Sequence, residues 1–176
     1  MKGHDPEDVK PNIRRNCGIG GSIFAAILLL FFDVANSGSY LMSSIFCPVW
    51  LFISIVKNAS QRPGWRVALL RIAIPILTLG VVWANNSFQW RIAEANAARI
   101  VKACEDFHAA NGRFPKTLDE LVPRYTPRVP RAKYCLTWGD FVYVNNQGTP
   151  ILWWYVVPPY CCKIYNFEQH RWSCLD

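Results

Sequence analysis

The sequence lacks most of the features by which enzymes are recognised. It contains three histidines in 176 residues, and it has no nucleophile elbow, phosphate-binding loop or His-Glu-x-x-His pair. His108 stands beside Glu105 and Asp106, a pattern typical of a solvated helix face. The spacing of the carboxylates marks no acid–base pair. We therefore expect no catalytic residues and no cofactor.

Acidic residues are almost missing from the first half of the chain. Between Gly18 and Trp83 the only acid is Asp33, although the whole chain carries 12 Asp and Glu. Three apolar segments, residues 18–32, 40–56 and 67–83, fill this part of the sequence. They have 15, 17 and 17 residues, close to the short end of what spans a bilayer. A chain this small could not bury three such helices in protein, so we predict three transmembrane helices.

Lysine and arginine are absent from the connection 33–39 and frequent in the segments on either side of it. Four of the first fifteen residues are basic, and the segment 57–66 carries Lys57, Arg62 and Arg66 with no acid. The positive-inside rule places both basic segments in the cytoplasm. We therefore predict a multi-pass protein of a bacterial inner membrane. Residues 1–17 form a cytoplasmic tail, 18–84 a three-helix transmembrane domain and 85–176 a periplasmic α+β domain.

The basic charge and the first apolar segment also allow two other interpretations. The first apolar segment has the basic and hydrophobic parts of a cleaved signal peptide but lacks a persuasive cleavage site, and cleavage would leave the last domain on the same side. The net charge of +7 could indicate nucleic-acid binding, but much of it flanks the membrane segments. We expect membrane lipid, and no nucleic acid, as a partner.

From residue 85 onward the composition is that of a water-soluble domain. Apolar residues recur at helical spacing and predict a helix over 88–111 that extends the third membrane helix into one rod. These residues are Trp90, Ala93, Ala97, Ile100, Cys104 and Phe107. Thr117 and Glu120 have the spacing of a capping box, which predicts a short helix limited by Pro123, with an extended segment over 125–130.

The last third of the chain changes to short runs of aromatic and β-branched residues. We predict strands at 134–138, 141–145, 151–157 and 160–165, with a further short strand at 171–174. Turn residues at 145–148 and the pair Pro158-Pro159 separate them. Such strands form an antiparallel sheet, and one of its faces should pack on the helix. The predicted fold is an α-helical membrane domain plus an α+β domain.

One stretch, residues 99–130, follows an outline known from other proteins. After a long helix come an aromatic residue, a glycine, an aromatic-Pro pair, a Leu-rich turn and a proline-bounded segment. The residues are Phe107, Gly112, Phe114, Pro115, Leu118, Leu121, Val122, Pro123 and Pro130. This outline resembles the pseudopilins of type II secretion and related type IV pilin-like proteins. The resemblance implies a pilin-like fold, with the long helix packed on the sheet.

The resemblance departs from the pilin pattern at the membrane. Pilins and pseudopilins carry a short basic leader that ends in Gly, followed by an apolar helix with Glu at its fifth position. No such sequence precedes the third helix, which opens GWRVALLRIAIPILTLG. Two extra spans would also hold the chain in the bilayer. We therefore expect a tethered pilin-like module and not a filament subunit.

Five of the seven cysteines fall in the outward domain, where disulfides persist. These are Cys104, Cys135, Cys161, Cys162 and Cys174, whereas Cys17 and Cys47 are apolar fillers of the membrane region. The favoured pairs are Cys162–Cys174 and Cys104–Cys135, although sequence alone does not fix the connectivity. The rival interpretation is a metal site at Cys104 and His108, with His170 near Cys174. That spacing matches no zinc motif, so we expect no metal.

Two features indicate a binding surface. Arg124, Arg128, Arg131 and Lys133 form a basic run among prolines, which is either a solvated loop or a site for an acidic protein or lipid headgroups. Trp153 and Trp154 are adjacent and cannot both point inward from a regular strand, so we expect exposed aromatic surface.

These features lead to a functional hypothesis, a non-catalytic, membrane-anchored protein-binding module. The most specific form is an immunity protein that protects the cell against an envelope-acting toxin delivered by a secretion system. The alternative is an accessory component of a type II secretion or type IV pilus-like assembly. An envelope enzyme or a metal-binding sensor is the least favoured.

Overall fold

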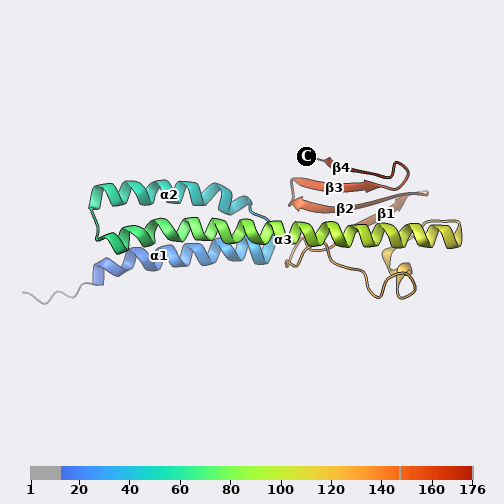
Figure 1. Ribbon diagram of the computed structural model, residues 1–176, viewed down its shortest axis with the longest axis horizontal. Coiled ribbons are helices and arrows are strands. Elements are labelled where there is room, and N and C mark those ends of the chain that lie inside the picture. The colour runs from blue at the N-terminus through green and yellow to red at the C-terminus, as the bar shows by residue number, and fades with distance from the viewer. Residues whose placement is uncertain (1–12, 147, 176) are drawn as a thin grey trace, which may run out of the picture.

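The computed structural model describes residues 13–146 and 148–175, with side chains from residue 19 onward. Most of the expected cytoplasmic tail and the side chain of Cys17 lie outside this part. The described residues contain three helices long and apolar enough to cross a membrane, which confirms the three predicted spans. The chain is a multi-pass membrane protein built from a helical part and an α+β part (Figure 1).

The first two membrane helices run alongside the base of the third. They are α1 (Ile13–Leu30), which continues into the π-helical segment η1 (Phe31–Ser37), and α2 (Leu41–Gln61). The third, α3 (Trp65–Asn111), is one continuous helix of 47 residues, about 70 Å long. Asp33 therefore lies inside a helix. Of the predicted connection 33–39, only residues 38 and 39 lie outside it.

Buried Asp33 fixes the start of α2. Its side chain is 1% exposed, and its two oxygens accept hydrogen bonds from the backbone amides of Met42 at 3.2 Å and Ser43 at 2.6 Å. Amides in the first turn of a helix have no partner within the helix. The single acid of the membrane half thus caps a helix N-terminus from outside that helix.

The membrane helices point large apolar side chains outward. Phe24, Phe52 and Leu77 are each more than 60% exposed, whereas the small polar residues Ser43 and Thr78 are buried. This distribution matches a lipid solvent, in which apolar surface needs no burial and small residues permit close helix packing. We call residues 13–84 the membrane domain and residues 85–175 the sheet domain.

The sheet domain packs an antiparallel meander on the distal half of α3. Its described strands are β1 (Val142–Asn146), β2 (Thr149–Val157), β3 (Cys161–Asn166) and β4 (Arg171–Leu175), in the order β1-β2-β3-β4. All three pairings are antiparallel. Four of the five predicted strands are confirmed. In Figure 1 the sheet lies along one side of α3, and the chain between α3 and β1 lies on the other side.

The core confirms most of the predicted helix stripe. Ala93, Ala97, Ile100, Cys104 and Phe107 are all buried. From the sheet, the inward residues Leu152, Trp154 and Tyr165 meet this stripe, together with Phe167. The prediction is wrong at Trp90, which is 36% exposed, whereas its neighbour Gln89 is 5% exposed.

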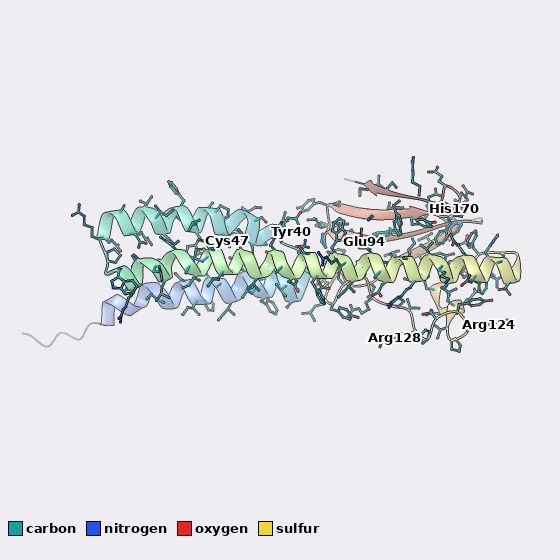
Figure 2. All side chains as sticks on the ribbon, in the orientation of Figure 1. Tyr40, Cys47, Glu94, Arg124, Arg128 and His170 are labelled. Atoms are coloured by element: carbon teal, nitrogen blue, oxygen red, sulfur yellow. The ribbon has the colours of Figure 1, made fainter. Side chains whose placement is uncertain are left out.

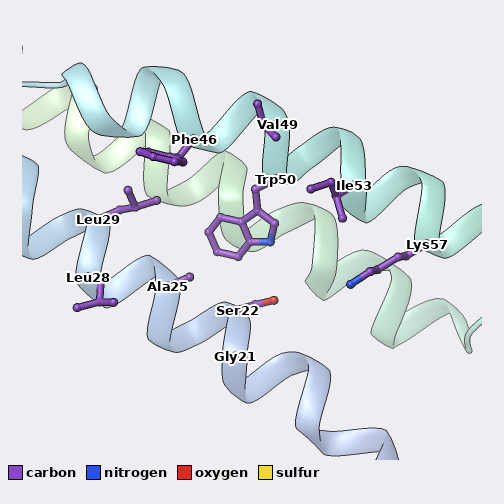
Figure 3. A pocket seen from close by; sticks show the side chains of 10 residues that line it. All are labelled: Gly21, Ser22, Ala25, Leu28, Leu29, Phe46, Val49, Trp50, Ile53 and Lys57. Carbon is purple, nitrogen blue, oxygen red and sulfur yellow. The ribbon is translucent and has the colours of Figure 1, made fainter.

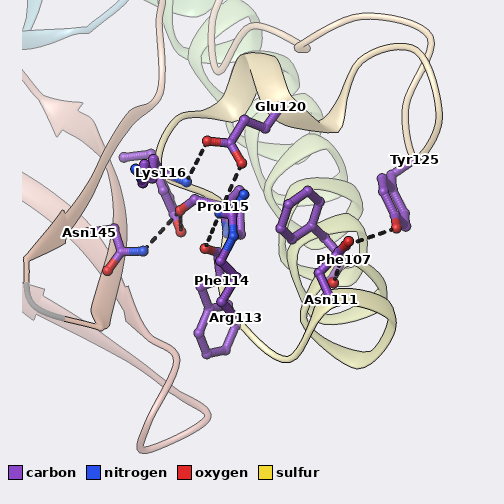
Figure 4. Close-up of polar contacts among 10 residues, drawn as sticks. Phe107, Asn111, Arg113, Phe114, Pro115, Lys116, Glu120, Tyr125 and Asn145 are labelled. Carbon is purple, nitrogen blue, oxygen red and sulfur yellow. Dashed lines mark hydrogen bonds and ion pairs between the residues drawn. The ribbon is translucent and has the colours of Figure 1, made fainter.

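The segment between α3 and the sheet contains the single-turn 3-10 helix η2 (Leu118–Leu121). The predicted capping box does not form, because Glu120 binds the amide of Lys116 at 3.2 Å and the guanidinium of Arg113 at 3.0 Å (Figure 4). Thr117 makes no capping bond with its side chain. Asn145 of β1 donates to the carbonyl of Pro115 at 3.0 Å, which fastens this segment to the sheet edge.

The predicted strand at 134–138 is instead an irregular loop that joins the two domains. The amides of Leu136 and Thr137 donate to the carbonyls of Ala35 and Asn36, at 2.9 and 3.1 Å. Backbone donors engaged in this way cannot pair with a neighbouring strand, which explains why the prediction was wrong. The loop is also tied to α3, because the Gln89 side chain bonds both backbone groups of Tyr134.

Candidate functional site

A cationic groove lies between α3 and the proline-rich segment that follows η2. It has a volume of about 690 Å³. We call it the arginine groove, and its lining residues are Asn96, Arg99, Thr126, Pro127, Arg128, Val129, Pro130, Arg131 and Tyr134. Figure 2 shows Arg124 and Arg128 on this segment, on the side of α3 opposite the sheet.

Hydrogen bonds and ring packing to α3 hold the proline-rich wall of the groove in place. The buried amide of Asn96 donates to the carbonyl of Arg131 at 2.8 Å. At the other end of the wall, the amide of Asn111 donates to the Tyr125 hydroxyl at 3.3 Å, and the Tyr125 ring packs 5.5 Å from Phe107 (Figure 4). Pro127 and Pro130 restrict the backbone between these anchors. The groove is therefore a preformed feature of the fold.

Three arginines line the groove. Arg131 pairs with Asp140 at 2.9 Å, and Arg99 reaches the side-chain oxygen of Asn96 at 3.4 Å. Arg128 is exposed and forms no ion pair with any described residue. No aspartate or glutamate is among the described residues that line the groove. Planar guanidinium groups bind carboxylates through paired hydrogen bonds, so this groove suits an anionic ligand.

The predicted basic run divides into three environments. Arg128 and Arg131 line the groove, whereas Arg124 is exposed outside it, 5.7 Å from the Tyr125 ring. The structure corrects the prediction that Lys133 contacts a partner. Its side chain is buried, and its ammonium donates to the carbonyls of Gly38 at 3.0 Å and Val156 at 2.7 Å. Burial lowers the pKa of Lys133 to about 8. Lys133 therefore joins the two domains and is not available to a partner.

The tryptophan pair follows the expected alternation, and only one of the two is accessible. Trp154 is 2% exposed and packs against the α3 stripe, with its ring 5.1 Å from Trp172, so its predicted role in partner binding is wrong. Trp153 is half-buried on the opposite face, 5.1 Å from the ring of Tyr155. Because Trp154 packs on α3, Trp153 points to the face of the sheet away from α3. The chain segment that lines the arginine groove lies on the other side of α3 from the sheet (Figure 1). The structure does not bring Trp153 and the arginines together.

The favoured disulfide between Cys162 and Cys174 is absent, and both residues are thiols. In the β3–β4 register Cys162 lies opposite Leu175, and Cys174 lies opposite Lys163. Residues directly opposite each other share a face, and successive residues alternate. The two cysteines therefore point to opposite faces of the sheet. Burial raises the pKa of the Cys162 thiol, and nearby Cys174 adds to this rise.

The other favoured pair, Cys104 and Cys135, is also unbridged. Cys104 lies in the core beneath the sheet, where burial raises its thiol pKa to about 12. Cys135 lies in the domain junction, next to Tyr134, whose backbone amide donates to the side chain of Gln89. Gln89 and Cys104 are fifteen residues apart on α3, which is about 22 Å along the axis. A disulfide requires Cα atoms within about 7 Å.

The histidines of the rival metal hypothesis have other contacts. His108 stacks on the ring of Phe114 at 4.3 Å, and Nδ1 of His170 lies 3.4 Å from Oε1 of Glu105. Across residues 13–146 and 148–175, no three His, Cys, Asp or Glu side chains gather in a way that could hold a metal ion.

Sequence reasoning missed the α3 side of the groove, formed by Asn96 and Arg99. A signal was present, since Gln89 and Asn96 are polar residues seven apart that flank the apolar stripe. Two turns of helix separate them, so both face the same way. Their amides bind the backbone of Tyr134 and Arg131 and thereby position the loop.

Comparisons with protein-family models, curated proteins and solved structures give no match for this chain. The residues that line the site indicate its chemistry. They line one hollow with three arginines, an asparagine and a tyrosine.

Proposed function

We propose that this protein is a non-catalytic, membrane-anchored binding protein that holds an acidic segment of another protein in the arginine groove. The observation that carries this proposal is that Arg99, Arg128 and Arg131 line one preformed hollow with no carboxylate among its described lining residues, and that only Arg131 of the three forms an ion pair with a described residue, Asp140. Such a groove favours aspartate- or glutamate-rich segments through charge-assisted, bidentate hydrogen bonds. It also attracts them over a distance and speeds their association.

The height of the groove above the bilayer favours a protein over lipid headgroups. Trp83, which is 66% exposed, is the last residue of the third predicted span, and Arg99 follows it sixteen residues later on the same helix. That separation is about 24 Å along the axis. The polar layer of a bilayer extends only about 5–8 Å beyond its hydrocarbon core. The outer part of the groove therefore stands in water.

The finer role that we propose is immunity. The chain is small and multi-pass, and α3 carries the groove outward as one rigid rod from the bilayer. The distribution of Lys and Arg favours the non-cytoplasmic side for the sheet domain, which in a bacterial inner membrane is the periplasm. A receptor in this position can bind a toxin that acts at the envelope before it reaches its target.

The second candidate is an accessory component of a type II secretion or type IV pilus-like assembly. It is favoured by one long helix that supports a meander of strands, together with the pseudopilin-like outline of residues 99–130. In this alternative the pilin-like module stays tethered, because α1 and α2 flank the base of α3 (Figure 1).

The binding proposal is tested with the full chain in lipid nanodiscs and a fluorescein-labelled decaglutamate peptide. Fluorescence anisotropy should show binding that weakens as salt rises, and the double variant Arg99→Glu/Arg128→Glu should reduce affinity at least tenfold. The matched single variants Arg128→Glu, in the groove, and Arg124→Glu, on the same segment outside it, make the same charge change, and Arg124→Glu should alter affinity less than twofold. Equal losses in both variants would show a diffuse charge effect and overturn the groove as the site.

The two finer roles are separated by a growth experiment. Deletion of the gene should be lethal only when a neighbouring toxin gene is intact, and the Arg99→Glu/Arg128→Glu variant should fail to restore growth where Arg124→Glu succeeds. Loss of secretion or piliation in the deletion strain, with no toxin-dependent death, would replace immunity by the assembly role.

A further inference from the structure

A second groove lies within the membrane domain, between α1 and α2. Both helices pack on α3 and leave a lipid-facing hollow of about 580 Å³ between them (Figure 3). We call it the interhelix groove. Its lining residues are Gly21, Ser22, Ala25, Leu28 and Leu29 of α1 and Phe46, Val49, Trp50, Ile53 and Lys57 of α2.

The two walls of the interhelix groove differ in size and charge. Part of the α1 wall consists of the small residues Gly21, Ser22 and Ala25. The opposite wall, from α2, carries larger aromatic and branched side chains (Figure 3). Lys57 is the one charged residue among the described residues that line the hollow. It belongs to the end of α2 that points away from the sheet domain, and its ammonium points toward the α1 side of the groove (Figure 3).

We propose that the interhelix groove binds an anionic phospholipid from the leaflet opposite the sheet domain. One acyl chain lies along the apolar walls, and the phosphate pairs with the ammonium of Lys57. A lysine near the end of a membrane helix reaches the headgroup layer, where it meets phosphate. Basic pockets between membrane helices are a recognised way of binding anionic headgroups.

The dimensions favour a lipid chain over a partner helix. An α-helix with its side chains is about 10 Å across, so fewer than two turns would fill a hollow of this volume. The ring of Trp50 also projects into the space between α1 and α2 (Figure 3). A flexible acyl chain can bend past this ring, whereas a rigid helix could not approach the small residues of α1. The site does not depend on the arginine groove.

Native mass spectrometry of the full chain tests the proposal. The protein is released from micelles that contain equal amounts of dioleoyl phosphatidylglycerol, which is anionic, and dioleoyl phosphatidylcholine, which is zwitterionic. We expect the anionic lipid to be retained at least fivefold more often. Lys57→Gln should bring the ratio close to one. Arg62→Gln removes a charge at the same membrane face outside the groove, and it should keep the preference.

A shape variant tests the apolar part independently of charge. A Cβ added at Gly20 or Gly21 would meet no atom within 4 Å, so a side chain can leave the backbone without a clash at either position. Gly21→Leu fills the groove and should reduce retention of both lipids at least threefold, whereas Gly20→Leu should leave it unchanged, because Gly20 does not line the groove.

Two results would overturn the proposal. The first is unchanged phosphatidylglycerol retention in both Lys57→Gln and Gly21→Leu, which would place the bound lipid elsewhere. The second is a lipid-free dimer that Gly21→Leu dissociates, which would make a second copy of the chain the occupant.

Discussion

The membrane domain and the sheet domain bury opposite kinds of residue. In the membrane domain Ser43, Ser54 and Thr78 are buried while large apolar side chains face outward. In the sheet domain Trp154 and Phe167 form the core while Arg124 and Arg128 face outward. The solvent decides which arrangement is stable, because apolar surface gains from burial in water but not in lipid.

One rule is nevertheless shared by the two domains, since each buries an ionisable side chain that bonds to backbone. Asp33 accepts from two amides of α2, and Lys133 donates to the carbonyls of Gly38 and Val156. Each side chain satisfies backbone groups at an irregular end of a regular element, where such groups would otherwise be orphaned. The following variants test whether these bonds are equally important in the two domains.

The largest effect is expected at Asp33 in the membrane domain. Asp33→Ala leaves the amides of Met42 and Ser43 without acceptors in a buried place, and it should reduce the free energy of unfolding by about 3–5 kcal/mol. Thermal unfolding in detergent measures this loss. Asp33→Asn keeps one acceptor oxygen and should lose about half as much. An Ala variant as stable as the native chain would contradict the capping role.

The second effect is a pH dependence at Lys133. The pKa falls from 10.5 to about 8 in the fold, so the unfolded chain binds more protons between these values and stability rises with pH across that window. At about 1.4 kcal/mol per pH unit, the rise is about 3 kcal/mol. The difference in unfolding free energy between the native chain and Lys133→Met, measured from pH 7 to 11, isolates this group. Parallel curves would show that Lys133 does not titrate in this window.

The smallest effect compares two glycines in left-handed conformations. Gly38 lies at the domain junction with φ of +59°, and an added Cβ would sit 3.1 Å from Cβ and Sγ of Cys135. Gly112 has φ of +68° with nothing within 4 Å. Gly112→Ala should cost about 1 kcal/mol for its backbone alone. Gly38→Ala should cost about 1–2 kcal/mol more because of overpacking, and equal losses would indicate a loose junction.

Local patterns predicted the elements of both domains well. Hydropathy located the three spans, and the apolar stripe from Ala93 to Phe107 located the face of α3 that meets the sheet. Alternation correctly predicted that Trp153 and Trp154 point in opposite directions. Each of these patterns depends on solvent and on local geometry, both of which a sequence carries in its spacing.

Errors gathered where distant segments meet. The strand expected at 134–138 became a loop because its amides bind Ala35 and Asn36, a hundred residues earlier in the chain. Lys133 is predicted as an exposed cation but is buried, because its ammonium binds the carbonyl of the distant Gly38. The favoured disulfides are prevented by strand register and by position along α3. The half of the arginine groove that α3 supplies was missed for the same reason.

The sequence by itself determined the three spans, the long helix, four strands and the basic character of the segment after η2. Only the tertiary structure decided which arginines share a groove, which lysine is buried and which cysteines lie too far apart to join. The physical reason is that solvent preference and backbone periodicity act over a few residues. Burial and pairing arise when segments far apart in the chain come together.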